Sequence, residues 1–172
     1  GAPIGCFALD LFARKGKAGG FYNQAIAGGF NASNGRRNLP FSYLHANFTP
    51  PKEGEESFLS FEELWTLLHE FGHVLHSIFG SQRHFMEGPD WLGAEWQEVP
   101  SIVLEKLAWE PEFLAQIAYD SSSGTVPDEK LLASIRASRE LMGSHQIRFL
   151  LAPTVLDLKL HSARPGEVSK VE

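Results

Sequence analysis

Residues 60–80, SFEELWTLLHEFGHVLHSIFG, constrain the fold of this chain more than any other segment. Ser60 followed by Glu63 is the pattern of a capping box, so a helix is expected to begin here, and Gly80 is expected to end it. On a helix the histidines of this segment lie opposite an apolar arc about 140° wide, which contains Leu64, Leu67, Leu68, Phe71, Val74, Leu75, Ile78 and Phe79. The helix is therefore predicted to back onto a core and to present a polar face to a cleft.

The polar face carries the pattern H-E-x-x-H, formed by His69, Glu70 and His73. Residues four apart lie one above the other on a helix, so both imidazoles can bind the same metal ion. A carboxylate beside such a pair can take a proton from a water on that metal. We therefore expect a catalytic metal site with His69 and His73 as ligands and Glu70 as the base. The alternative is a solvated helix face that carries histidines by chance.

A catalytic zinc site needs a third protein ligand and an open position for water. His76 shares the face, but it lies about 10 Å from His69 along the helix axis, too far for one ion to bridge, and we expect it to flank the site. The acidic residues of the next helical segment are better candidates, although a solvated acidic face remains the alternative. Spacing alone does not choose among Glu95, Glu98 and Glu105. Surface or packing roles are expected for His45, His84, His145 and His161.

Three segments ahead of the motif helix are rich in aromatic and aliphatic residues and are predicted to be strands, at 4–13, 21–30 and 39–48. The last of them alternates between two sets of side chains, as a strand with two different faces does. Short glycine-rich links, one of them at 31–37, join the three segments. We expect a small antiparallel or mixed sheet of about three strands within residues 5–48.

Helical patterns dominate the rest of the chain, after a loop at 81–93. A helix is predicted over 94–109 in spite of Pro100, which is tolerated in a first turn or kinks the helix. A short helix over 112–120 follows, and then an amphipathic helix that begins at Asp128 and is expected to end near Gly143. A last helical stretch contains Pro153. The predicted fold class is α+β, mainly α.

Composition excludes several classes of protein. The chain has 172 residues, of which 43% are hydrophobic and 21% charged, as in a globular domain. Its net charge of -6, without long basic blocks, argues against a nucleic-acid partner. No apolar run approaches the roughly 18–20 residues that a membrane helix needs. Nothing in the sequence indicates the oligomeric state.

The single cysteine bears on where in the cell the protein is located. Cys6 cannot form an internal disulfide, fits a reducing compartment and is expected to be a small core residue. A cytoplasmic location is predicted, with an organelle matrix such as that of a mitochondrion or chloroplast as the alternative. The chain begins without methionine in a strand-like run, so we expect a piece of a longer protein.

Four segments together resemble a known family: FALDLFARKGKAGG, LPFSYLHANFTPP, LLHEFGHVLHSIF and EVPSIVLEKLAW. In order and spacing they are similar to the thimet oligopeptidase / oligopeptidase A / neurolysin family of zinc metallopeptidases, over nearly the whole chain. The resemblance implies a zincin-like (gluzincin-like) catalytic core with one Zn²⁺ per chain. It implies that Glu98 is the third zinc ligand and that Glu105 accepts the ring N–H of a ligating histidine. It also implies that the strand containing LHANF borders the cleft, where a peptide could pair with its backbone.

This resemblance further implies a zinc-dependent metallopeptidase that hydrolyses short oligopeptides, with Glu70 as general base for a zinc-activated water. Residues 1–172 would form a single partial domain, the catalytic core. The family's flanking helical domain and its downstream substrate-binding loop would lie outside these residues. The chain departs from the family pattern at Gly88-Pro89-Asp90 and Ala94-Glu95, so the loop between the two ligand helices is expected to behave differently. The alternative is a non-catalytic fragment or divergent relative that binds zinc or peptide without turnover.

Overall fold

The computed structural model of the chain describes residues 1–80 and 92–164. The chain divides into two compact units, Gly1–Ala108 and Trp109–Glu172. Most of the predicted loop at 81–93 lies outside the described residues, and so do His84 and the family departure at Gly88-Pro89-Asp90. Among the described helices, none combines the length and the apolar character that a membrane span requires. The expectation of a single partial domain stays a prediction.

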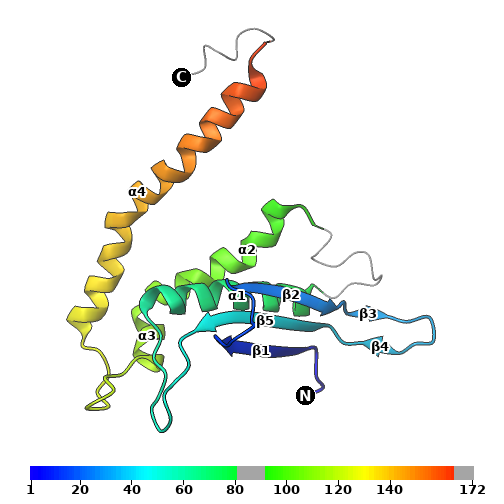
Figure 1. Cartoon of the computed structure of the whole chain (residues 1–172). Coiled ribbons are helices and arrows are strands. Elements are labelled where there is room, and N and C mark those ends of the chain that lie inside the picture. The colour runs from blue at the N-terminus through cyan, green and yellow to red at the C-terminus, as the bar shows by residue number, and fades with distance from the viewer. Residues whose placement is uncertain (81–91, 165–172) are drawn as a thin grey trace. The chain divides into compact units, whose positions relative to one another are not determined.

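The first unit contains a mixed three-stranded sheet in the order β1-β5-β2 (Figure 1). β1 (Cys6–Phe12) pairs with β5 (Phe41–Phe48) in parallel, and β2 (Tyr22–Ala27) pairs with the other side of β5 in antiparallel fashion. The expected small mixed sheet is thereby confirmed. The link predicted as a simple turn instead contains a short antiparallel hairpin of β3 (Phe30–Asn31) and β4 (Arg37–Asn38).

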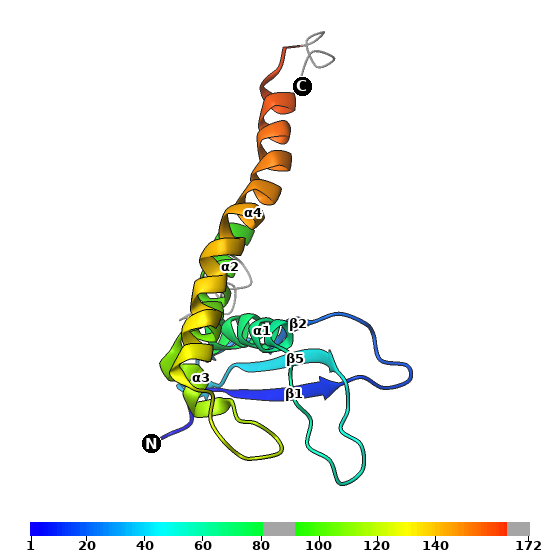
Figure 2. The same ribbon diagram turned by 90° about the vertical axis from the view of Figure 1, so that its left-hand side faces the viewer.

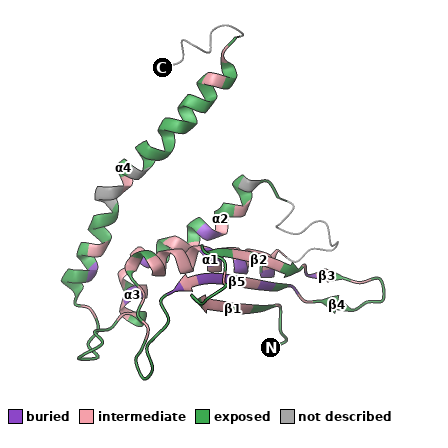
Figure 3. Cartoon of the chain, viewed as in Figure 1, coloured by how far each residue is buried: buried purple, intermediate pink, exposed green. Residues whose placement is uncertain are grey.

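β5 is the central strand, and one of its faces is completely buried (Figure 3). The predicted alternation is confirmed, because the buried face consists of Ser42, Leu44, Ala46 and Phe48. On the other face His45 is buried as well, since the ring of Tyr22 stacks on it at 4.3 Å. Cys6, expected in the core, is exposed at the start of β1, because that strand lies at the edge of the sheet.

The H-E-x-x-H segment forms helix α1 (Phe61–Phe79), which lies across one face of the sheet (Figures 1 and 2). The capping box is present: the backbone N–H of Glu63 donates to the Ser60 side chain at 3.2 Å, and the backbone N–H of Ser60 donates to the Glu63 carboxylate at 2.8 Å. Gly80 is the C-cap, as expected. The core between α1 and β5 is built from Leu44, Ala46, Phe48, Val74 and Ile78.

Phe79 was predicted in the apolar arc of α1 and is instead 68% exposed. The buried cluster against the sheet reaches along the helix only as far as Ile78, so the last apolar residue has no core to enter. The pattern of a helix therefore predicts which side faces inward, but not how far the neighbouring layer extends.

α2 (Ala94–Glu105) packs against α1 on the side away from the sheet, so that α1 lies between the sheet and α2 (Figure 2). Pro100 lies within α2, as the sequence predicts, and the 3₁₀ helix η3 (Lys106–Trp109) continues the chain. This layering places the polar face of α1 against α2. It is the arrangement that forms the candidate site.

The second unit contains α3 (Pro111–Ile117) and α4 (Glu129–Ser162). Asp128 caps α4 by accepting the backbone N–H of Leu131 at 2.7 Å. The prediction that this helix ends near Gly143 is wrong, because α4 continues through that glycine. A glycine inside a helix costs only about 1 kcal/mol relative to alanine, and Gly143 does not adopt the positive φ that ends many helices. The described residues as a whole are α+β in content, with helix dominant.

Candidate metal site

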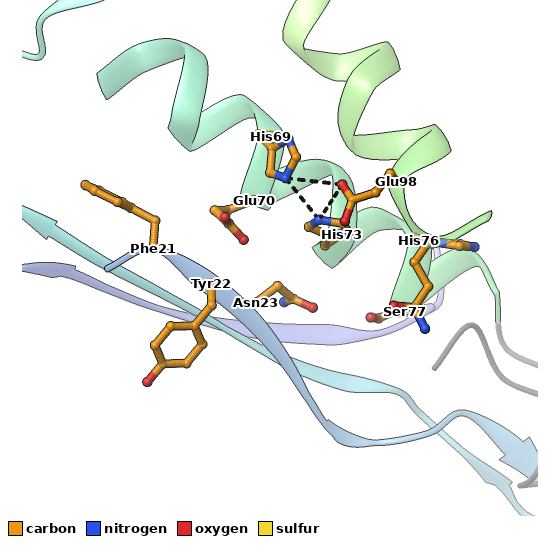
Figure 4. A pocket seen from close by; sticks show the side chains of 10 residues that line it. Phe21, Tyr22, Asn23, His69, Glu70, His73, His76, Ser77 and Glu98 are labelled. Atoms are coloured by element: carbon orange, nitrogen blue, oxygen red, sulfur yellow. Dashed lines mark hydrogen bonds and ion pairs between the residues drawn. The ribbon is translucent and has the colours of Figure 1, made fainter. Parts of the chain in front are cut away.

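His69 and His73 on α1 and Glu98 on α2 bring three potential ligand atoms together (Figure 4). The Nε2 atoms of the two histidines are 3.2 Å apart. Oε2 of Glu98 lies 3.4 Å from each of these nitrogens. Within residues 1–80 and 92–164, this is the one group of three or more His, Cys, Asp or Glu side chains close enough to hold an ion.

The three separations and the types of ligand atom fit one zinc ion. Zinc is bound tetrahedrally at about 2.0–2.1 Å from imidazole nitrogen and carboxylate oxygen, which places ligand atoms about 3.3–3.4 Å apart. Two imidazoles and one carboxylate also match the ligand sets of catalytic zinc sites, in which the fourth position is open. A chance contact of three side chains would not require all three distances to be nearly equal.

Both histidine rings are held by further hydrogen bonds. Nδ1 of His69 lies 2.5 Å from Oε1 of Glu105, so the Nδ1–H can donate to this carboxylate and leave the Nε2 lone pair for a metal. The ring of His73 makes a hydrogen bond with the backbone of Gln97. Burial is the main cause that lowers the pKa of His73, and the neutral imidazole that this favours is the form that binds a metal.

The Glu70 carboxylate lies on the side of the histidines that faces β2 (Figure 4). Its residue is only 8% exposed, and burial raises its pKa above the ordinary value for glutamate. A backbone hydrogen bond from Asn23, and a positive charge on His69 when its ring is protonated, oppose this shift, because both stabilise the ionised carboxylate. Glu70 thus binds a proton more readily than a solvated glutamate does.

A pocket of about 300 Å³ opens in front of these groups. His76 lines the pocket but does not belong to the three-atom group, as its spacing predicts. Glu95, left open as a ligand by spacing alone, is exposed and is likewise not part of that group. The pocket is lined by Phe21, Tyr22, Asn23, His69, Glu70, His73, His76, Ser77, Gln97 and Glu98.

Comparison with known proteins adds independent information. The model of peptidase family M3 matches residues 1–171 of the chain. The chain belongs to peptidase family M3. This confirms the family expected from the four sequence segments.

Several curated relatives of this M3 chain are similar over nearly its whole length. Oligopeptidase A of Escherichia coli (strain K12) is 33% identical over 171 residues, which are 97% of this chain and 25% of the relative. Mitochondrial intermediate peptidase of Arabidopsis thaliana is 30% identical over 94% of this chain and 23% of its own length. Dipeptidyl carboxypeptidase of Escherichia coli (strain K12) is 30% identical over 97% of this chain and 24% of its own length. The M3 chain therefore spans about a quarter of each of these relatives.

One expectation about the cleft of this M3 chain is wrong. The strand that contains LHANF is β5, and both of its edges are already paired, with β1 and with β2. A peptide therefore cannot pair with the β5 backbone. β2 and the residue before it border the pocket instead, through Phe21, Tyr22 and Asn23.

Sequence reasoning missed three residues around the site of the M3 chain. Asn23 donates its backbone N–H to Glu70, and Gln97 contacts the ring of His73 through its backbone. Backbone contacts carry no signal in residue type, so no pattern could have indicated them. Ser101 donates to the Glu98 side chain at 2.8 Å. A polar residue one helical turn after a candidate ligand was the available signal.

Proposed function

We propose that this chain is the zinc-binding part of a zinc-dependent metallopeptidase that hydrolyses short oligopeptides. The observation that carries the proposal is the triangle of His69 Nε2, His73 Nε2 and Glu98 Oε2 beside the buried carboxylate of Glu70. These three ligands would hold one Zn²⁺ per chain, in a zincin-like (gluzincin-like) core. When bound, zinc supplies Lewis-acid chemistry: it polarises a carbonyl and brings the pKa of a water toward 7.

Glu70 is proposed as the catalytic base. Its carboxylate takes a proton from the attacking water and delivers that proton to the amine nitrogen of the leaving group. The raised pKa that burial gives Glu70 favours the protonated intermediate stage between these two transfers. Glu105 holds the ring of His69 in the tautomer that presents Nε2 to the ligand triangle.

The outer edge of β2 is proposed as the place where a peptide substrate lies. Among the described strands β2 pairs only with β5, so the backbone groups of its other edge, apart from the N–H of Asn23, are open to hydrogen bonds with an extended peptide. Asn23 of β2 donates its backbone N–H to Glu70, so this edge runs beside the proposed base. The names of the relatives oligopeptidase A and dipeptidyl carboxypeptidase support peptides as the class of substrate.

The location in the cell also stays a proposal. A cytoplasmic location is retained, with an organelle matrix as the alternative. The name of one relative, mitochondrial intermediate peptidase, assigns that protein to mitochondria and supports the alternative.

Glu70→Gln tests the proposed reaction. The variant keeps His69, His73 and Glu98, so it should bind Zn²⁺ as the wild type does. Cleavage of a short fluorescence-quenched peptide should fall by about 10²–10⁴-fold, which is the usual contribution of a general base. Full cleavage by a zinc-loaded Glu70→Gln chain would contradict the assigned role.

The second candidate function is binding of zinc or peptide without turnover. It is favoured by one observation, that the chain spans only 25% of oligopeptidase A. The same peptide assay separates the two functions. Cleavage by the wild-type chain that a chelator abolishes and Zn²⁺ restores would exclude the non-catalytic alternative, whereas zinc binding without cleavage would support it.

A further inference from the structure

Ser101 of α2 lies one helical turn after Glu98 and is completely buried. Its hydroxyl oxygen is 2.8 Å from two acceptors of the same residue, the main-chain oxygen of Glu98 and its carboxylate Oε2. A hydroxyl group has only one proton to donate. A carboxylate is the stronger acceptor, because a hydrogen bond to a charged oxygen is roughly twice as strong as a neutral one. The proton of Ser101 is therefore directed to Oε2.

Oε2 is also the oxygen that faces the two histidines, at 3.4 Å from each Nε2. The side chain of Glu98 is 49% exposed, so packing alone does not restrict it to one rotamer. Long acidic side chains lose considerable rotamer freedom when they are fixed in one position. The hydrogen bond from Ser101 selects the rotamer that points the oxygen at the imidazoles.

Ser101 is itself held in place by a close approach of α1 and α2. A Cβ atom on Gly72 would lie 2.4 Å from the Cα of Ser101 and 2.7 Å from the main-chain oxygen of Pro100. These are backbone atoms and cannot swing aside as the end of a flexible side chain could. Gly72 stands between His69 and His73 in the sequence, so the point where the helices touch lies within the motif.

We propose that Ser101 is a positioning residue, which holds Oε2 of Glu98 toward His69 and His73 before a metal ion arrives. It touches neither substrate nor reacting atoms and acts through Glu98. This inference rests on the proposed function, because it takes Glu98 as a zinc ligand. Loss of a group that orients a ligand typically weakens metal binding by about 10–100-fold, and that is the expected effect of removing the hydroxyl.

The competing explanation is that Ser101 only fills the space where the helices cross. Ser101→Ala addresses this, because alanine keeps the Cβ atom, removes only the hydroxyl and is a better helix former than serine. Ser138→Ala is the control: the hydroxyl of the exposed Ser138 donates to the main-chain oxygen of Ile135, three residues back, at 2.7 Å, which is close to the spacing of the Ser101 hydroxyl from the main-chain oxygen of Glu98. In the described residues no carboxylate is bonded to Ser138.

The experiment measures the Zn²⁺ dissociation constant of the full chain by competition with a chromophoric chelator, with circular dichroism as the check of folding. Ser101→Ala should bind Zn²⁺ about 10–100-fold more weakly than wild type, and Ser138→Ala should bind it equally well. The same substitution is then made in a Glu98→Ala background. There it should have no further effect, because Glu98→Ala has already removed the residue through which Ser101 acts. This double-mutant cycle measures the coupling between the two side chains.

The outcomes separate this inference from the proposed function. Wild-type-like Zn²⁺ affinity of Ser101→Ala would overturn the positioning role alone, while the zinc site would stand. An equal loss of Zn²⁺ affinity on Ser101→Ala with and without Glu98 would also overturn it, because the hydroxyl would then act by stabilising the fold and not through Glu98. A wild-type chain that binds no Zn²⁺ would instead contradict the proposed function itself.

Discussion

Nδ1 of His69 on α1 lies 2.5 Å from Oε1 of Glu105 on α2. Glu98, two turns earlier on α2, faces the opposite nitrogen of the same ring, since its Oε2 lies 3.4 Å from Nε2. One imidazole therefore lies between two carboxylates of a single helix. The contact with Glu105 fixes its orientation and tautomer, and Nε2 is left to face Glu98, as is typical of a histidine that ligates a metal.

The first prediction concerns Glu105, the carboxylate that contacts Nδ1 of His69 and does not belong to the ligand group. Glu105→Gln keeps the shape of the side chain but removes its charge, so the hydrogen bond that orients His69 becomes weaker. The Zn²⁺ dissociation constant should rise by about 10–100-fold, as measured by chelator competition. Glu95→Gln is the control, because Glu95 lies on the same helix outside the ligand group, and its affinity should not change.

A second prediction concerns the crossing of α1 and α2. Gly72→Ala places a methyl group 2.4 Å from the Cα of Ser101, so α2 must move away from α1. Overpacking of this kind costs about 1–3 kcal/mol, which should appear as a lower free energy of unfolding in urea. In Gly143→Ala the new methyl group meets no atom within 4 Å, and the better helix propensity of alanine should leave stability equal or higher. Equal stability of Gly72→Ala and wild type would contradict the close approach.

Lys17 supports a third prediction, on the stability of the sheet. Its side chain is only 2% exposed. The ammonium group donates to the main-chain oxygens of Asp10 and Phe12, each at 2.9 Å, and to that of Ala46. Lys17→Met would remove the donor of these three acceptors, of which the main-chain oxygen of Ala46 belongs to a fully buried residue. It should lower the free energy of unfolding by roughly 1–3 kcal/mol, the usual cost of a buried acceptor left without its donor. Lys15→Met, at an exposed lysine in the same loop, should change it little.

The fourth prediction concerns pH. A hydrogen bond from Arg14, and then one from Tyr43, hold the pKa of Asp10 well below its usual range, with Lys17 adding to the effect. A depressed pKa in the folded state means that the ionised carboxylate stabilises the fold. This stabilisation is present above the unfolded-state pKa of about 4 and is lost as the pH falls toward the lower folded-state value.

Asp10→Asn provides the measurement. The difference in free energy of unfolding between wild type and this variant should be constant above about pH 5 and should shrink below about pH 4. A difference that grows in acid would contradict the sign of the shift.

Patterns in the sequence predicted the features that residues close together in the chain determine. The capping box at Ser60 and Glu63 began α1 where expected, because both hydrogen bonds form within one turn. The alternation along β5 predicted its buried face, because successive side chains of a strand point to opposite sides. The spacing of His69 and His73 likewise predicted that their ring nitrogens come together.

Other features depend on tertiary contacts and could not be predicted from residue patterns. Glu95, Glu98 and Glu105 all belong to one helix, and only the way α2 crosses α1 at Gly72 brings Glu98 toward the histidines. Lys17 belongs to a segment with the composition of a solvated turn, yet the sheet buries its ammonium group. Strand order gave no sequence signal either, and the family resemblance led us to expect the strand containing LHANF, β5, at the cleft, although it is the centre of the sheet.

X-ray absorption at the zinc edge measures whether His69, His73 and Glu98 bind one zinc ion. The chain is dialysed against Zn²⁺, the bound metal is quantified, and the scattering around zinc is measured for wild type and for Glu98→Ala. We expect one zinc per chain with two imidazoles and an oxygen ligand at about 2.0–2.1 Å, and weaker zinc retention in the variant. A chain that retains no zinc, or a zinc ion without imidazole scattering, would contradict it.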